Sequence, residues 1–279
     1  MKQDSRTVSN IEIVPLCDAI GPMGASLRRP LPETFPGSDA LWERLRRETP
    51  EVFGPDGEWI LRFHCFVLRV PTGPTILVDT GLGPEDSPAA SWAPVPGVLP
   101  TALADMGLAP EDIDVVVLTH LHSDHVGGAV AKGEPVFPNA RHLVQRAELD
   151  WLESGGGPVL DDVVRPLGPL LDPVTGETTL APALKAVPTP GHTPGHQSVV
   201  LGDMELVVAG DVVLHPVQLA DPSVGYIYDD DAEKAAATRT ALLAGLREHD
   251  GVLAAPHLPA PFIRVLDAWT SGDKARGDV

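Results

Sequence analysis

The sequence lacks several features that mark particular classes of protein. It has only two cysteines among 279 residues, so we expect no disulfide framework and no cysteine-rich metal module. No apolar run approaches the roughly 18 residues that a membrane-spanning helix needs. The first ten residues, MKQDSRTVSN, have no apolar core of the kind found in secretory signals. We therefore expect a cytoplasmic protein with reduced cysteines.

Positive charge is scarce as well. The chain has 20 Lys and Arg residues against 39 Asp and Glu residues, which gives a formal net charge of −19. Nucleic acid and anionic membrane surfaces would repel such a chain, so we expect neither as a partner. The acidity serves solubility, and carboxylates can in addition contribute to a divalent-metal site.

What the sequence does contain is a mixture of short strand-like runs and helical patterns along its whole length. This mixture predicts a layered α/β architecture in a single domain spanning residues 1–279. Helices are expected at 98–106, 146–153 and 231–249. Strands are expected at 10–16, 61–70, 75–79, 115–119, 141–145, 184–188, 197–201, 205–209 and 252–255.

One long segment, residues 21–58, has no clear periodicity and is rich in proline. We interpret it as a loop region near the active site, with a short helix around 39–47, because structureless segments of this length are usually functional. The segment and its end supply four aromatic residues. They could form an apolar wall for a substrate or pack the segment onto the body of the protein, and they are Phe35, Trp42, Phe53 and Trp59.

The stretch THLHSDHVGG, residues 119–128, places three of the chain's ten histidines and one aspartate within six residues. Residues at i and i+2 of an extended segment point the same way, so His120 and His122 can reach one metal ion. Asp124 and His125 follow as the chain turns and can reach a second point nearby. Imidazole and carboxylate groups are ligands for zinc, manganese or iron. The cluster therefore predicts a metal site at the end of a buried strand.

Three further candidate ligands follow strand-like runs later in the chain. His192 lies in TPGHTPGH, Asp211 in VVAGDVV and His257 in AAPHLP. Two more histidines stay ambiguous at this point. His196 is either a ligand or a hydrogen-bonding loop residue, and His215 either lines the pocket or has a structural role.

The order of these motifs resembles the metallo-β-lactamase-fold hydrolase superfamily. H-x-H-x-D-H is followed by P-G-H-T, a strand ending in G-D and a final histidine, with ILVDTG at 76–81 before them. The resemblance implies an αββα four-layer sandwich and two divalent ions, Zn²⁺ first, with Mn²⁺, Fe²⁺ or Co²⁺ as alternatives. It implies one ion held by His120, His122 and His192, a second by Asp124, His125 and His257, and Asp211 bridging both. Asp79 matches the family's buried aspartate, which orients a ligand histidine.

Within the superfamily, the segments GHTPGHQS and 209–243 resemble the branch of N-acyl homoserine lactonases and methyl-parathion-hydrolase-like enzymes. That resemblance implies a metal-bridging hydroxide that cleaves a lactone or carboxylic ester, with Asp124 passing a proton to the leaving group. A phosphotriester is the alternative substrate. Lactonases often carry a tyrosine shortly after the bridging aspartate. Here that region reads VVLH, and the nearest tyrosines are Tyr226 and Tyr228.

Other functions of the same fold fit these residues less well. A mononuclear iron sulfur dioxygenase is the alternative in a different reaction class, but seven ligands suit two ions. A nuclease is disfavoured by the charge of −19. A drug-resistance β-lactamase is disfavoured because those enzymes usually lack the last histidine of H-x-H-x-D-H. The resemblance also points to a possible homodimer.

Overall fold

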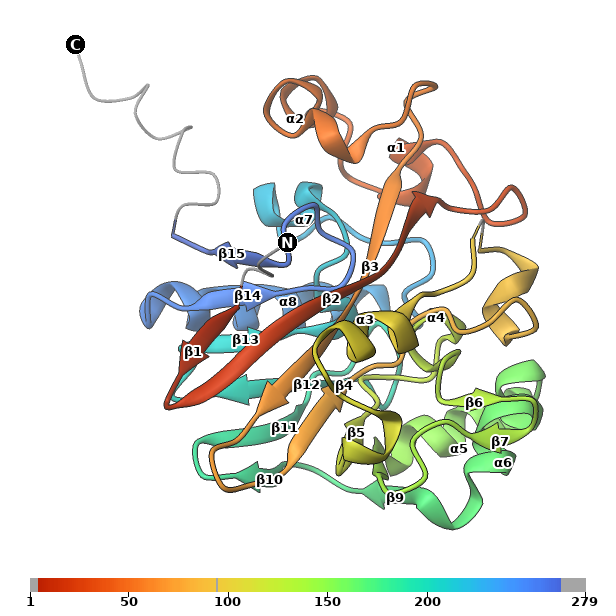
Figure 1. Ribbon diagram of the computed structural model, residues 1–279. Helices are drawn as coiled ribbons and strands as arrows, with labels where there is room; N and C mark the ends of the chain where they lie inside the picture. Colours follow the sequence, from red (N-terminus) through yellow and green to blue (C-terminus); the bar gives the residue numbers. More distant parts are fainter. Residues whose placement is uncertain (1–4, 94, 267–279) are drawn as a thin grey trace.

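The computed structural model describes residues 5–93 and 95–266, and two mixed β-sheets form its centre (Figure 1). The first sheet has seven strands, in spatial order β1 (Arg6–Val8), β2 (Ile11–Pro22), β3 (Ile60–Arg69), β4 (Thr75–Val78), β5 (Val115–Val117), β8 (Arg141–Gln145) and β9 (Leu171–Val174). The second has six, in the order β10 (Thr178–Ala181), β11 (Leu184–Pro188), β12 (Gln197–Leu201), β13 (Leu206–Val208), β14 (Val252–Ala254) and β15 (Phe262–Arg264). A small ribbon pairs β6 (Val130–Ala131) with β7 (Glu134–Pro135).

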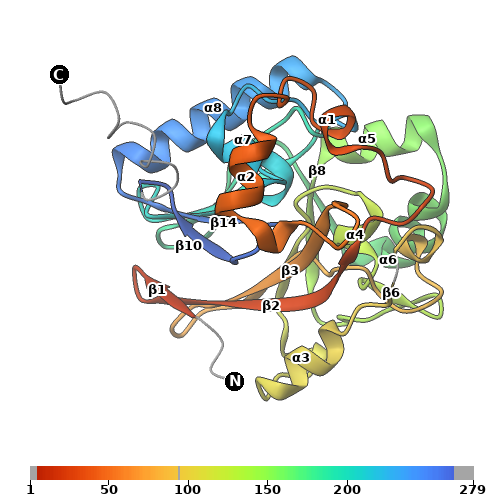
Figure 2. The same cartoon turned by 90° about the horizontal axis from the view of Figure 1, so that it is seen from above.

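Helices cover the outer faces of both sheets. Figure 2 shows α8 along one outer side of the molecule and α3 along the opposite side, with the sheets between them. The α-helices are α1 (Leu31–Thr34), α2 (Trp42–Glu48), α3 (Leu99–Asp105), α4 (Ser123–Val126), α5 (Arg146–Gly155), α6 (Arg165–Leu167), α7 (Pro216–Ala220) and α8 (Ala232–Glu248). The 3₁₀ and π turns are η1 (Pro50–Val52), η2 (Pro88–Ser91), η3 (Pro110–Asp112), η4 (Leu160–Val164), η5 (Gly168–Leu170) and η6 (Gly210–Val212).

The alternation of side chains along the strands explains the four layers. Val67 and Leu77 point outward and pack with α3 and α5, whereas their neighbours Phe66 and Ile76 point inward to the second sheet. On the far side, Leu243 of α8 packs on the outer face of β13 and β14. Because both faces of each central strand are buried, the strands read as apolar runs. The predicted αββα sandwich is confirmed.

Segment 23–59 lies above the ends of β2 and β3 (Figure 1). It contains α1, α2 and η1, and α2 falls close to the helix expected at 39–47. Its four aromatic rings surround the imidazole of His215, with centroid distances to it of 5.0 to 6.3 Å. Of the two alternatives left open by the sequence, these aromatics therefore pack the segment onto the body.

The directions of the strands place the site. β5 runs parallel to β4 and β8, and β13 runs parallel to β14, so the carboxyl ends of these parallel strands share one edge of each sheet. Loops after these ends are where α/β proteins hold ligands. Among the described residues, no helix combines the length and apolar character that crossing a membrane requires.

Candidate metal centre

The seven candidate ligands all follow strand ends. His120 comes after β5, and His122 is the residue before α4, which carries Asp124 and His125. The other three come from the second sheet. They lie in the loop after β11, in η6 after β13, and after β14, and are His192, Asp211 and His257. The structure thus brings together all the residues that the sequence singled out as ligands.

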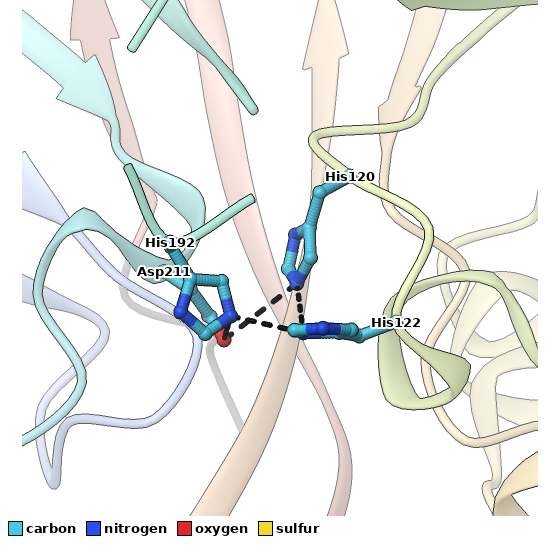
Figure 3. A group of neighbouring side chains, drawn as sticks. All are labelled: His120, His122, His192 and Asp211. Atoms are coloured by element: carbon cyan, nitrogen blue, oxygen red, sulfur yellow. Dashed lines mark hydrogen bonds and ion pairs between the residues drawn. The ribbon is translucent and has the colours of Figure 1, made fainter. Parts of the chain in front are cut away.

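The first group consists of three histidines and one carboxylate (Figure 3). Nδ1 of His122 lies 3.0 Å from Nε2 of His120 and 2.9 Å from Nε2 of His192. Oδ2 of Asp211 lies 3.3 Å from Nε2 of His192. The four ligand atoms all lie within 4.8 Å of one another.

The second group consists of Asp124, His125 and His257, whose ligand atoms also lie within 4.8 Å of one another. Oδ2 of Asp124 is 3.6 Å from Nε2 of His125 and 3.5 Å from Nε2 of His257. Oδ1 of Asp211 lies 3.3 Å from the first of these nitrogens and 3.2 Å from the second. Asp211 therefore turns one carboxylate oxygen toward each group.

The donor atoms of the first group suit a cation. Burial, together with the neighbouring histidines, lowers the pKa of His120 and of His122 well below the usual range, so both rings are neutral near pH 7. Their nitrogens converge on one point with Oδ2 of Asp211 and with Nε2 of His192, whose pKa Asp211 and Asp229 raise to about 9 despite burial. A divalent ion at that point would accept an electron pair from each of these atoms. Three imidazoles and a carboxylate form a donor set typical of zinc and neighbouring metals.

The second group is richer in negative charge. Burial alone would lower the pKa of His125, but the carboxylates of Asp211, Asp124 and Asp79 outweigh it and raise that pKa well above its usual range. The pKa of His257 is raised for the same reason, against burial and chiefly by Asp211. Nε2 of His125 and Oδ1 of Asp211 are buried and make no hydrogen bond with any described residue. A divalent ion would satisfy both atoms.

Asp79 is hydrogen-bonded to the H-x-H-x-D-H loop and orients His125, as the family resemblance implies for this aspartate. It follows β4 with a left-handed φ of 60° and accepts three hydrogen bonds. Its donors are the N–H of Thr119, the hydroxyl of Thr119 and Nδ1 of His125, each at 2.8 Å. The carboxylate thus fixes the ring of His125 so that Nε2 faces the second group.

Glu148 on α5 supports the site in a way that the sequence did not reveal. Its buried carboxylate accepts from the N–H of Leu121 and from the N–H of Gly195, both at 2.9 Å. Leu121 lies between His120 and His122, and Gly195 lies in the loop after His192. A Cβ at Gly195 would come within 2.2 Å of the Glu148 backbone, so only glycine fits there.

The two ambiguous histidines have structural surroundings. Nδ1 of His196 contacts the hydroxyl of Thr189, and Nε2 accepts the N–H of Asp211 at 3.0 Å, so His196 holds the turn that carries Asp211. His215 precedes α7, where Nδ1 accepts the N–H of Val217, and its ring sits among the aromatics of segment 23–59. Neither belongs to a ligand group among the described residues.

A pocket of about 190 Å³ opens over both groups. Its polar floor is formed by His122, Ser123, Asp124, His192, Asp211 and His257. Its walls are mostly apolar and are formed by Met23, Leu27, Leu61, Trp92, Leu214, Tyr226 and Tyr228. The four aromatics of segment 23–59 are absent from this lining. Trp92 lines the pocket instead, and its indole N–H donates to the hydroxyl of Ser123 at 2.9 Å.

Two tyrosines reach this pocket from the loop before α8. The ring of Tyr226 is stacked on His192, at 5.9 Å between centroids. The hydroxyl of Tyr228 donates to the carbonyl of Leu27 at 2.8 Å and so joins two of the segments that form the apolar wall. Although no tyrosine closely follows Asp211 in sequence, folding brings Tyr226 to the same pocket.

Comparison with known proteins agrees with this geometry. Residues 64–255, well over half of the chain, match the sequence model of the Metallo-beta-lactamase superfamily. The chain therefore belongs to the metallo-beta-lactamase superfamily.

Among the relatives in sequence are N-acyl homoserine lactonases. The AttM lactonase of Rhizobium radiobacter is 39% identical over 104 residues, which cover 32% of this chain and 36% of that protein. A lactonase of a Bacillus species is 33% identical over 99 residues, 36% of each chain. The matched part thus spans only about a third of the length of these curated relatives.

Solved structures extend the likeness over the whole fold. AidC, a dizinc quorum-quenching lactonase in complex with a product, N-hexanoyl-L-homoserine, has a TM-score of 0.77 at 23% identity, over 93% of this chain and 91% of that one. The hydrolase AbOPH of the beta lactamase superfamily has a TM-score of 0.76 at 25% identity, over 92% and 90%. At 23% identity, the likeness to AidC concerns the fold.

Proposed function

We propose that this protein is a dinuclear metal-dependent hydrolase that cleaves a lactone or carboxylic ester. The observation that carries the proposal is the position of Asp211. Its two carboxylate oxygens face two separate groups of ligand atoms, at 3.3 Å and at 3.2 Å from their nearest histidine nitrogens, on the floor of one pocket. A purely structural role would not require seven ligand-type side chains to converge beneath an opening.

Zinc is the metal we propose first, with manganese, iron or cobalt as alternatives. Five imidazoles and two carboxylates suit zinc, and the related lactonase AidC is dizinc. When bound, two such ions supply hydroxide from water near neutral pH and act as Lewis acids toward an ester carbonyl.

Asp124 is the residue that we propose for proton transfer. Its carboxylate belongs to the second group and also lines the pocket, so it can face both an ion and a substrate. A carboxylate in that place can take a proton from the attacking water and pass it to the leaving alkoxide oxygen, and such general acid–base help typically contributes about 10²–10⁴-fold in rate.

The walls of the pocket support a small ester with an apolar substituent. Met23, Leu27 and Leu61 offer apolar surface beside the polar floor. Tyr226 lines the pocket next to His192, where its hydroxyl can donate to a substrate oxygen. Relatives matched in sequence are N-acyl homoserine lactonases. As that name states, their substrates combine an acyl group with a lactone.

The test combines metal content with a substrate panel. The protein, purified without chelators, should hold about two ions per chain and should hydrolyse an acyl-homoserine lactone or an aryl ester. Asp124→Asn should reduce kcat more than it changes KM. A phosphotriester as the only good substrate would move the protein to the alternative branch. One iron per chain without hydrolysis would overturn the proposal in favour of a dioxygenase.

A further inference from the structure

A buried ion pair between α8 and the preceding loop lies behind the first ligand group. Arg239 of α8 is only 1% exposed, which is rare for arginine. Its guanidinium donates to the carbonyls of Val212, at 3.1 Å, and Val224, at 2.7 Å, and one Nη lies 3.8 Å from Oδ2 of Asp229. A charged side chain in such a place must be compensated, and Asp229 is its only carboxylate partner among the described ion pairs.

Asp229 in turn contacts a candidate metal ligand. Its Oδ1 accepts Nδ1–H of His192 at 2.9 Å, and its Oδ2 accepts the N–H of Tyr226 at 3.2 Å. The backbone of the same loop is joined to the backbone around His192, because the N–H of Asp230 donates to the His192 carbonyl at 3.0 Å. The carboxylate therefore fixes both the tautomer and the direction of the ring, with Nε2 turned to the first group.

The support is specific to one group. The Nδ1 atoms of the second group are held elsewhere, that of His125 by Asp79 and that of His257 by the carbonyl of Arg62. Among the described residues, Asp229 makes no hydrogen bond or ion pair with a ligand of the second group. A change at Asp229 should thus act directly on the first group, and on the second group only through the shared Asp211.

We infer that Asp229, charge-balanced by the buried Arg239, is a positioning residue that sets the affinity of the His120–His122–His192 group for its metal ion. The inference rests on the proposed function, because it requires that the two groups hold metal ions. A carboxylate behind a histidine ligand makes the facing nitrogen a better donor, and removing such a partner typically costs about 10- to 100-fold in metal affinity.

The experiment is a metal titration of the metal-free protein with Co²⁺, followed by absorbance and by native mass spectrometry. Wild type should bind two ions. Asp229→Ala should bind the ion of the first group about 10- to 100-fold more weakly, and the ion of the second group with a much smaller loss. Asp229→Asn keeps an oxygen acceptor without the charge, so its loss should be smaller.

The matched control is Asp231→Asn. Asp231 belongs to the same acidic run, but it accepts the N–H of Lys234 at 3.0 Å as the cap of α8 and does not touch His192. This variant should bind two ions like wild type. A thermal melt of each variant checks that the fold is kept.

A second variant, His257→Ala, identifies which group holds the weakened ion. In His257→Ala, which weakens the second group, the ion that stays bound should occupy the first group, and adding Asp229→Ala should weaken that ion too. If Asp229→Ala binds both ions with wild-type affinity, or loses affinity equally for both, the inference is overturned. If wild type itself binds fewer than two ions, the proposed function fails instead, so the two failures are distinguishable.

Discussion

The two ligand groups share Asp211 but differ in their electrostatics. The first is built from three imidazoles. Burial beside other histidines lowers the pKa of His120 and His122, whereas Asp211 and Asp229 raise the pKa of His192 to about 9 despite burial. The second is surrounded by carboxylates, and His125 and His257 have raised pKa values despite burial. One carboxylate thus joins a nitrogen-rich half and an acid-rich half, so the two halves of the site should respond differently to change.

The largest loss of metal binding and activity is expected from a change at Asp211, the ligand that both halves share. Asp211→Ala removes an oxygen from both groups at once, so both ions should bind weakly. We expect hydrolysis to fall on the order of 10³-fold or more. Metal per chain and kcat/KM measure this. Retention of either ion at wild-type affinity would show that Asp211 is not shared.

Removing one ligand from one half should weaken the ion of that half and leave the ion of the other half bound. His122→Ala and His257→Ala should each leave about one tightly bound ion per chain, from opposite halves, with activity reduced on the order of 10²-fold or more. Titration with Co²⁺ should give different absorption spectra for the two variants, because one remaining half is nitrogen-rich and the other acid-rich. Identical spectra would contradict the comparison.

A change behind the first half should give a smaller effect. Glu148→Gln leaves one of two buried N–H groups, on Leu121 or Gly195, without an acceptor, because an amide offers only one oxygen. We expect about 10-fold weaker binding of the first ion and a loss of about 1–3 kcal/mol in the free energy of unfolding. Denaturant melts and metal titration test this. A second ion weakened as much as the first would argue against the assignment.

The smallest effect on the metal site is expected from His142, which lies outside both halves and acts on the pH dependence of stability. Burial lowers the pKa of His142, on β8, to about 4. The unfolded chain takes up this proton near pH 6.5 and the folded chain only near pH 4, so stability falls as the pH drops between these values. From pH 7 to pH 5 the loss is about 2 kcal/mol.

His142→Leu provides the comparison for that value. The unfolding free energy of this variant should decrease less than that of wild type between pH 7 and pH 5, when metal-free protein is unfolded with urea at each pH. An equal decrease in both proteins would mean that His142 does not contribute to the pH dependence.

The sequence predicts this molecule best where neighbours in sequence are neighbours in space. His120, His122, Asp124 and His125 lie within six residues, so strand geometry alone suffices to place them together. Candidates in the second sheet were found because each follows an apolar run. Short edge strands such as β1 and β15 were missed, since three residues carry too little pattern.

The supporting residues escaped prediction for a different reason. Glu148 looks like any acidic residue on an amphipathic helix, and Asp229 looks like part of an acidic cap before α8. Only Asp231 has that capping role in the structure. The place of Trp92 in the pocket wall also escaped prediction, because this residue reaches the pocket from another loop. Each of these roles depends on a partner far away in the chain, which local patterns do not encode.

The shared carboxylate makes the two halves a single thermodynamic unit. The two oxygens of Asp211 belong to one rigid plane, and the backbone behind them is held by His196. An ion that fixes one of these oxygens therefore also fixes the orientation of the other oxygen. Reciprocity then requires that each ion alter the affinity of its neighbour by the same factor. Occupancy of this centre should accordingly depend on metal concentration in a cooperative manner, with a coupling that Asp211 itself sets.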